Sequence, residues 1–338
     1  MHKITLIPGD GIGPAIIAAT VRVIEATGVK IEWDRQLAGM AAVAEYDNPL
    51  PDATIESIRR NRLCLKGPLT TPVGGGYRSV NVTLRQAFNL YANVRPAISF
   101  EGADTAFKNV NLVTVRENTE GLYAGIEHFI KVDEEKIGAE SIAVITRKGS
   151  ERVIEYAFEY ARNAGRKKVT LVHKANILKC TSGLFLEIGR EVAQRYPDIE
   201  FDDRIVDACC MQLVMQPEKY DVIVTTNLFG DILSDLASGL VGGLGLTAGA
   251  NIGVDAALFE AVHGSAPDIA DKGIANPSAT ILAGAMMLEH IGAQHAARQI
   301  EQAVREVIKE GIYVTPDLKP GSQYGTDDLA NAVIKRMS

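Results

Sequence analysis

A short run of polar side chains follows a glycine-rich loop in the first third of the chain. Ser79, Asn81 and Arg85 bring a hydroxyl, an amide and a guanidinium close together in sequence, and Arg95 follows soon after. If residues 80–90 form a helix, Asn81 and Arg85 lie one turn apart on the same face. Arginines bind carboxylates through paired hydrogen bonds while hydroxyl and amide groups fix orientation, so this face suits a small, multiply charged anion. A solvated helix face with incidental arginines fits the same spacing equally well.

Polar residues also follow strand-like segments farther along the chain. Arg116 lies near the end of one apolar segment, and Lys174 comes directly after another. Parallel sheets bind ligands at the carboxyl ends of their strands, which makes both positions candidates for a site. A lysine in such a place is either a general base or simply a cap for the strand end.

Two aspartates stand one helical turn apart where a helix is expected to begin. Asp231 and Asp235 would then share one face, where carboxylate oxygens can bind Mg²⁺ or Mn²⁺ together with waters and substrate. The alternative is that acidic residues favour the first turns of a helix through its dipole. Asp207 joins the pair only if folding or association brings it near.

The glycine motif at residues 8–14 superficially resembles a dinucleotide-binding fingerprint, with Glu32 and Asp34 farther on. Its glycines alternate as Gly-x-Gly-x-Gly, however, and Pro14 interrupts the spacing that the fingerprint needs before its last glycine. We therefore predict a tight turn that brings the backbone close to a ligand, and not a standard Rossmann site.

The composition is that of an ordinary soluble enzyme. A chain of 338 residues with 46% hydrophobic residues exceeds the usual size of a single core, which predicts two domains. A net charge of −7 without a basic stripe argues against a nucleic-acid partner, and no apolar stretch is long enough to predict a membrane span. Cys64, Cys180, Cys209 and Cys210 lack disulfide or zinc spacing, which favours a reducing compartment. No signal peptide precedes the first apolar strand, so we expect a cytoplasmic location.

Strand-like and helix-like segments alternate along the chain, which predicts an α/β fold. Short buried strands are expected at 3–8, 63–66, 111–115, 141–146, 168–173 and 221–226. Helical apolar spacing covers 14–26, 153–164, 185–196, 232–240, 279–291 and 293–309. No repeat or low-complexity linker marks a domain boundary, which is compatible with lobes interleaved in sequence.

Several motifs together resemble the metal-dependent decarboxylating β-hydroxyacid dehydrogenases, which act on isocitrate, isopropylmalate, homoisocitrate or tartrate. The most specific are residues 227–235, 242–253 and 260–267. Ser79, Asn81 and Arg85 look like the isocitrate branch, because isopropylmalate enzymes carry an apolar pocket at that place. The resemblance implies a two-domain isocitrate/isopropylmalate dehydrogenase-like fold, distinct from a standard Rossmann fold. Residues 1–93 and 243–338 would form a large domain and 94–242 a small one, with an intersubunit clasp near 121–147.

The resemblance also assigns roles to individual residues. The three carboxylates of isocitrate would be bound by Ser79, Asn81, Arg85, Arg95 and Arg116. A divalent metal, Mg²⁺ or Mn²⁺, would be held by Asp207, Asp231 and Asp235. Proton transfers would belong to Tyr123 and Lys174, and the cofactor NAD to Thr70, His263, Gly264, Asp268, Ile269 and Asn276. In this family the equivalents of Lys174 and Asp207 come from the neighbouring subunit, which implies a homodimer with shared sites.

The choice between NAD and NADP depends on one dipeptide. Asp268 can accept hydrogen bonds from both ribose hydroxyls and would repel a 2′-phosphate, whereas phosphate-using relatives carry lysine and tyrosine in place of Asp268 and Ile269. An ordinary loop aspartate is the alternative. The predicted activity is oxidative decarboxylation of isocitrate to 2-oxoglutarate with reduction of NAD. A sister dehydrogenase for homoisocitrate or isopropylmalate and a regulatory subunit remain as alternatives, the latter disfavoured because the catalytic residue types are present.

Overall fold

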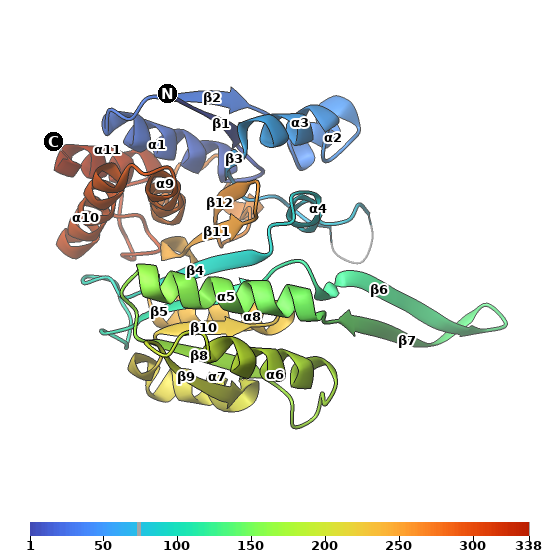
Figure 1. Ribbon diagram of the computed structural model, residues 1–338. Coiled ribbons are helices and arrows are strands. Elements are labelled where there is room, and N and C mark those ends of the chain that lie inside the picture. The colour runs from blue at the N-terminus through green and yellow to red at the C-terminus, as the bar shows by residue number, and fades with distance from the viewer. Residues whose placement is uncertain (73–75, 338) are drawn as a thin grey trace. The chain divides into compact units, whose positions relative to one another are not determined.

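The computed structural model describes residues 1–72 and 76–337, which fold into two compact units (Figure 1). The first unit contains Met1–Leu90, Arg95–Val110 and the chain from Ser238 onward, and the second contains Tyr91–Val94 and Asn111–Ala237. Both chain ends therefore belong to the first unit. Residues 73–75 of the glycine-rich loop before Ser79 lie outside the described residues.

The first unit is built on a sheet with strands in the order β2-β1-β3-β12-β11. These strands are β1 (His2–Ile7), β2 (Ile31–Arg35), β3 (Leu63–Lys66), β11 (Ala248–Ile252) and β12 (Ala257–Ala261). β1 is parallel to β2 and β3, and β3 is parallel to β12, while β11 is antiparallel to β12. β4 (Ala92–Ile98) has residues in both units.

Helices of the first unit pack on this sheet and on one another. They are α1 (Gly13–Ala26), α2 (Met40–Tyr46), α3 (Asp52–Asn61), α4 (Val80–Ala87), α9 (Ser278–His290), α10 (Gln294–Glu310) and α11 (Thr326–Met337). α9 packs against β11, β12, α1 and α10, and nine of its thirteen residues are buried. The helix expected over 80–90 is α4, which ends at Ala87 and therefore still carries both Asn81 and Arg85.

The second unit contains a parallel sheet with strands in the order β5-β10-β8-β9. Its elements are β5 (Asn111–Glu117), β8 (Lys168–His173), β9 (Glu200–Ile205), β10 (Val222–Thr225), α5 (Arg147–Asn163), α6 (Thr181–Ala193), α7 (Val206–Met215) and α8 (Asn227–Leu240). Thr225 lies beside Arg116 on one neighbouring strand and Val172 on the other. This register brings the carboxyl ends of β5, β10 and β8 to one edge, where polar residues follow each strand.

A long hairpin corrects one prediction. Residues 141–146 were expected to form a short buried strand, but they belong in part to β7 (Glu135–Val144), which pairs antiparallel with β6 (Gly121–Val132). The hairpin projects from the sheet of its unit (Figure 1), and its side chains, Phe129 and Ile137 among them, are largely exposed. The prediction was wrong because apolar residues were taken as a sign of burial, whereas these residues belong to a two-stranded hairpin that leaves them partly or fully exposed. None of the helices in the described part of the chain is long and apolar enough to cross a lipid bilayer.

Candidate active site

The turn at residues 8–14 needs its glycines for contact with other backbone segments. A Cβ atom at Gly9 would lie 2.4 Å from the carbonyl oxygen of Pro68, and one at Gly11 would lie 2.0 Å from that of Ser265. Both glycines also have positive φ angles. The hydroxyl of Ser265 in turn lies 2.8 Å from that of Thr70. The close approach in this turn is therefore to protein backbone, and it holds together segments that carry predicted cofactor residues.

Asp34 is not the free carboxylate that a Rossmann site uses for ribose. Its side chain accepts hydrogen bonds from Ser57 at 2.8 Å and Asn61 at 3.0 Å and pairs with Arg60 at 2.5 Å. Burial raises the pKa of Asp34, but these hydrogen bonds outweigh burial and hold the pKa below its usual value. The carboxylate is fully used within the unit, in agreement with the prediction that this is not a standard Rossmann fold.

A cavity of about 460 Å³ in the first unit collects four of the residues predicted to bind the cofactor, namely His263, Gly264, Ile269 and Asn276. Residues that sequence reasoning missed complete the wall: Ile12, Gly245, Ala266, Ile274, Ala275, Pro316 and Asp317. Asn276 Nδ2 donates to Asp317 Oδ2 at 2.9 Å, a contact between distant segments that no local pattern signals. Thr70 and the exposed Asp268 lie outside the wall.

His263, which lines this cavity, has one ring nitrogen without a hydrogen-bond partner among the described residues. Nδ1 lies 2.9 Å from the carbonyl oxygen of Gly264, and because a carbonyl only accepts, Nδ1 carries the proton. Burial lowers the pKa of His263, which favours the neutral ring with an unprotonated Nε2. Nε2 is buried and has no hydrogen-bond partner among the described residues. Buried polar atoms are normally paired, so an unpaired acceptor on a residue of the cavity wall is compatible with a ligand that carries a hydrogen-bond donor.

The predicted substrate residues of the first unit lie on and around α4. Ser79 caps this helix by accepting a hydrogen bond from the amide of Val82. Asn81 Oδ1 and Arg85 Nε are buried without a partner among the described residues. The Arg85 side chain is only 11% exposed, so the alternative of a solvated helix face is wrong for this residue. Arg95 is buried as well, on β4.

A buried ion-pair network, which sequence reasoning missed, lies behind Arg85. Lys66 and Glu260 face each other on the paired strands β3 and β12, and their charged groups are 2.6 Å apart. Glu260 also lies 3.6 Å from Arg85 and accepts a hydrogen bond from Asn251 at 2.8 Å. Burial raises the pKa of Glu260, but the two cations outweigh it and lower the pKa to about 2. Two cations share one carboxylate, which leaves positive charge for an anionic ligand.

In the second unit, Arg116 at the end of β5 is fixed by α8. Its Nε and Nη2 donate to Asn227 Oδ1 at 3.0 and 2.7 Å, and its Nη1 pairs with Asp231. A Cβ atom at Gly230 would lie 2.5 Å from the Arg116 side chain, so glycine is required there. Asn227 was named only as part of a motif, and its contact with Arg116 identifies its role.

Tyr123 reaches the same carboxylate from the start of β6. Its hydroxyl donates to Asp231 Oδ2 at 2.5 Å, and its ring lies beside the Arg116 guanidinium, 5.1 Å from centroid to carbon. Burial raises the pKa of Tyr123, the bond to Asp231 raises it further, and Arg116 lowers it less. Tyr123 therefore keeps its proton at neutral pH and can act as a proton donor.

Lys174 and Asp207 form a pair at the ends of β8 and β9. Lys174 Nζ donates to Asp207 Oδ1 at 2.6 Å, and this hydrogen bond lowers the pKa of Asp207. Asp207 lies in the first turn of α7, while Asp231 and Asp235 lie one turn apart on α8. Within residues 1–72 and 76–337 of one chain, no three acidic, histidine or cysteine side chains lie close enough to hold a metal ion. Carboxylate oxygens are nevertheless the ligands that Mg²⁺ and Mn²⁺ prefer.

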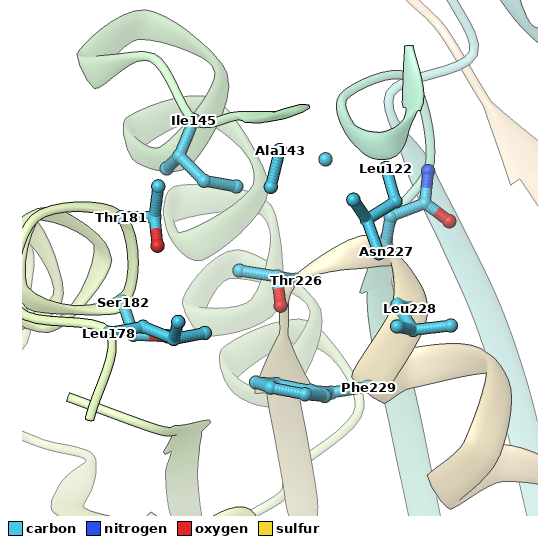
Figure 2. A pocket seen from close by; sticks show the side chains of 11 residues that line it. Leu122, Ala143, Ile145, Leu178, Thr181, Ser182, Thr226, Asn227, Leu228 and Phe229 are labelled. Atoms are coloured by element: carbon cyan, nitrogen blue, oxygen red, sulfur yellow. The ribbon is translucent and has the colours of Figure 1, made fainter. Parts of the chain in front are cut away.

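A smaller cavity of about 90 Å³ lies in the second unit, between β6, β7, α6 and α8 (Figure 2). Leu122, Leu178 and Phe229 contribute apolar walls, and Thr181, Ser182 and Asn227 contribute polar atoms. Its lining is mainly apolar, so it adds little chemistry to the residues described above.

Comparison with known proteins gives concordant results. Residues 3–333 match the family model described as isocitrate/isopropylmalate dehydrogenase. A crystal structure of isocitrate dehydrogenase from Methylococcus capsulatus is 80% identical, with a TM-score of 0.98 over 100% of this chain and 99% of that chain. The probable mitochondrial isocitrate dehydrogenase (NAD) subunit alpha of Drosophila melanogaster is 50% identical over 99% of this chain and 87% of its own length. The chloroplastic 3-isopropylmalate dehydrogenase of Solanum tuberosum is 48% identical over 91% and 86%, respectively.

Proposed function

Because the chain belongs to the isocitrate/isopropylmalate dehydrogenase family, and is thus an oxidoreductase, we propose that it converts isocitrate and NAD to 2-oxoglutarate, carbon dioxide and NADH. The observation that carries the choice of substrate is the buried Arg85 Nε on α4, a hydrogen-bond donor without a partner among the described residues. A substrate carboxylate can accept from this donor, whereas an isopropyl group would leave it unpaired, and a site built from polar groups strongly rejects such an analogue.

In this proposal the substrate carboxylates are bound by residues whose side chains can form hydrogen bonds, namely Ser79, Asn81, Arg85, Arg95 and Arg116. Arg85 and Arg116 are the anchors, because both guanidinium groups are already oriented by neighbouring side chains. An oriented arginine loses little freedom when it binds a carboxylate.

Two side chains carry the proposed proton transfers. Lys174 takes the proton of the substrate hydroxyl as hydride leaves the same carbon for NAD, and Tyr123 returns a proton to carbon after decarboxylation. The raised pKa of Tyr123 supports this assignment, since the hydroxyl enters the reaction protonated. A divalent cation, when bound by Asp207, Asp231 and Asp235, would supply Lewis-acid polarisation of the substrate oxygens.

NAD would bind with its adenosine half in the cavity of the first unit. The acceptor His263 Nε2 and the walls formed by Ile269 and Asn276 support this, and Asp268 adjoins Ile269 in the chain. A carboxylate at Asp268 favours free ribose hydroxyls over a 2′-phosphate. Thr70 and Gly264 would complete the cofactor contacts.

We further propose a homodimer in which Lys174 and Asp207 act in the partner's site. Exposed apolar side chains support association: Phe129 and Ile137 on the hairpin, Met215 on α7 and Ile232 on α8 are each at least half exposed. Exposed apolar side chains that form a contiguous patch mark contact surfaces, and association would cover these residues. Sedimentation as a monomer at micromolar concentration would contradict this part of the proposal.

A direct assay tests the activity. NADH formation is measured with isocitrate, isopropylmalate and homoisocitrate, in the presence of Mg²⁺ and again with excess chelator. We expect the highest kcat/KM with isocitrate and NAD, and loss of turnover with chelator. Preference for another acid would contradict the proposed substrate. Preference for NADP would contradict the proposed cofactor, and full activity with chelator would contradict the proposed role of the metal. Inactivity on all three acids would point to a regulatory subunit.

A further inference from the structure

Lys174 leaves β8 through a peptide group that is held at both ends. Its carbonyl oxygen accepts hydrogen bonds from the amides of Ile177 at 3.1 Å and Leu178 at 2.8 Å. The other end of the same peptide plane, the N–H of Ala175, donates to Nδ1 of His173 at 3.0 Å. His173 and Ala175, the two neighbours of Lys174 in the chain, are therefore joined by a hydrogen bond.

The ring of His173 is itself fixed from the interior of the unit. Because the Ala175 N–H donates to Nδ1, that nitrogen carries no proton, and a neutral ring must be protonated at Nε2. Nε2 lies 3.1 Å from Asp203 Oδ2 on the neighbouring strand β9. The second oxygen of Asp203 accepts from Arg190 of α6 at 3.0 Å. His173 is only 5% exposed, so solvent does not compete for these bonds.

The side chain of Lys174 has four rotatable bonds and is 26% exposed, and its ion pair is with Asp207, whose side chain is 68% exposed. Partly exposed ion pairs hold their partners weakly. The direction in which Lys174 projects therefore depends strongly on its backbone. The peptide plane between Lys174 and Ala175 determines one of the two backbone angles of Lys174.

We propose that His173 is a positioning residue for Lys174: its unprotonated Nδ1 fixes the peptide plane that aims the amine. The role of His173 rests on the proposed proton transfer by Lys174. A displacement of about 1 Å between reacting groups can cost up to roughly a hundredfold in rate, so loss of this one acceptor acts on kcat. KM for isocitrate should stay unchanged, because His173 touches neither the substrate arginines nor α4.

Two substitutions separate positioning from packing. In His173→Asn, Oδ1 can take the place of Nδ1 and accept from Ala175, but the contact with Asp203 is lost. In His173→Gln, the amide can reach Asp203 and fill more of the ring volume, but no atom replaces Nδ1. We expect kcat to stay within about threefold of the parent in the Asn variant and to fall about tenfold or more in the Gln variant, with KM constant in both. A packing role predicts the reverse order, because Asn leaves the larger cavity.

The assay uses the full-length protein with isocitrate, NAD and saturating Mg²⁺, beside thermal unfolding of each variant. Lys174→Met is the reference: retained turnover would overturn the role of Lys174 and that of His173 with it. If Lys174→Met is inactive but His173→Gln is unimpaired, only the role of His173 is overturned. The same holds if His173→Gln changes KM alone. If either His173 variant fails to fold, Asp203→Ala gives the second test. It frees the ring to rotate, and kcat should fall several-fold at constant KM; an unchanged kcat would equally overturn the proposal.

Discussion

The ion pair between Lys66 and Glu260 should contribute a large and pH-dependent share of stability, which Glu260→Gln would remove without changing side-chain size. Burial raises the pKa of Glu260, but Lys66 and Arg85 lower it from 4.5 to about 2. That difference corresponds to about 3 kcal/mol of stabilisation at neutral pH. Because the folded pKa lies below the unfolded one, the contribution is fully present above pH 4.5 and is lost as the pH falls toward about 2.

Urea unfolding followed by circular dichroism measures this difference, at fixed protein concentration in case the folded protein is a dimer. Glu260→Gln should lower the free energy of unfolding by about 3 kcal/mol at neutral pH and at pH 5. This difference from the parent should become smaller as the pH is lowered further. Glu32→Gln is the control, since Glu32 pairs with Lys3 on the surface and its loss should cost under about 1 kcal/mol. A gap below about 1 kcal/mol at neutral pH, or one that persists unchanged down to pH 3, would refute the charge-based reasoning.

Three further predictions concern the active site. Asn81→Ala should lower kcat/KM for isocitrate by at least about tenfold while sparing any weak isopropylmalate activity; equal losses on both acids would remove Asn81 from substrate choice. Asp268→Lys combined with Ile269→Tyr should raise the ratio of kcat/KM with NADP to that with NAD by about tenfold or more, and a parent enzyme that already prefers NADP would refute the role of this dipeptide. Tyr123→Phe and Lys174→Met should each be nearly inactive alone, yet refolding them together should restore about a quarter of parental activity, because half the dimers are hybrids with one intact site. Confirmed hybrids without activity would exclude shared sites.

The sequence predicted elements well where one unit alone decides their burial. Short apolar runs at 63–66 and 168–173 became β3 and β8 because both are covered within their own sheets. The same logic failed for residues 141–146, whose apolar side chains lie on an exposed hairpin. Apolar composition favours burial, but it does not by itself decide whether a segment is buried within its own unit.

The candidate site divides in the same way. The positions of Arg116 and Lys174 at the carboxyl ends of parallel strands were predictable, because apolar runs of strand length end at these residues. Lys66 and Glu260 were not, because only the register between β3 and β12 places them opposite each other. His173 was equally hidden, since its role depends on a bond to the backbone two residues on and on the partner that fixes its ring. Residue spacing in the sequence predicts which side chains share a face of one helix or strand. The contacts of Lys66, Glu260 and His173 instead depend on which strands pair, and these strands are distant in the sequence.

The two units prepare an arginine in the same manner. Arg85 lies beside Glu260, which is braced by the amide of Asn251, and Arg116 is held by Asn227 and Asp231. A buried arginine without such partners would be costly, so each carboxylate stabilises the guanidinium before a ligand arrives. Since an oriented guanidinium has little freedom left to lose, binding a carboxylate adds affinity at low entropic cost. A ligand that lacks the carboxylate opposite Arg85 leaves the buried donor Arg85 Nε unpaired, and we expect discrimination among similar acids to arise from that penalty more than from shape.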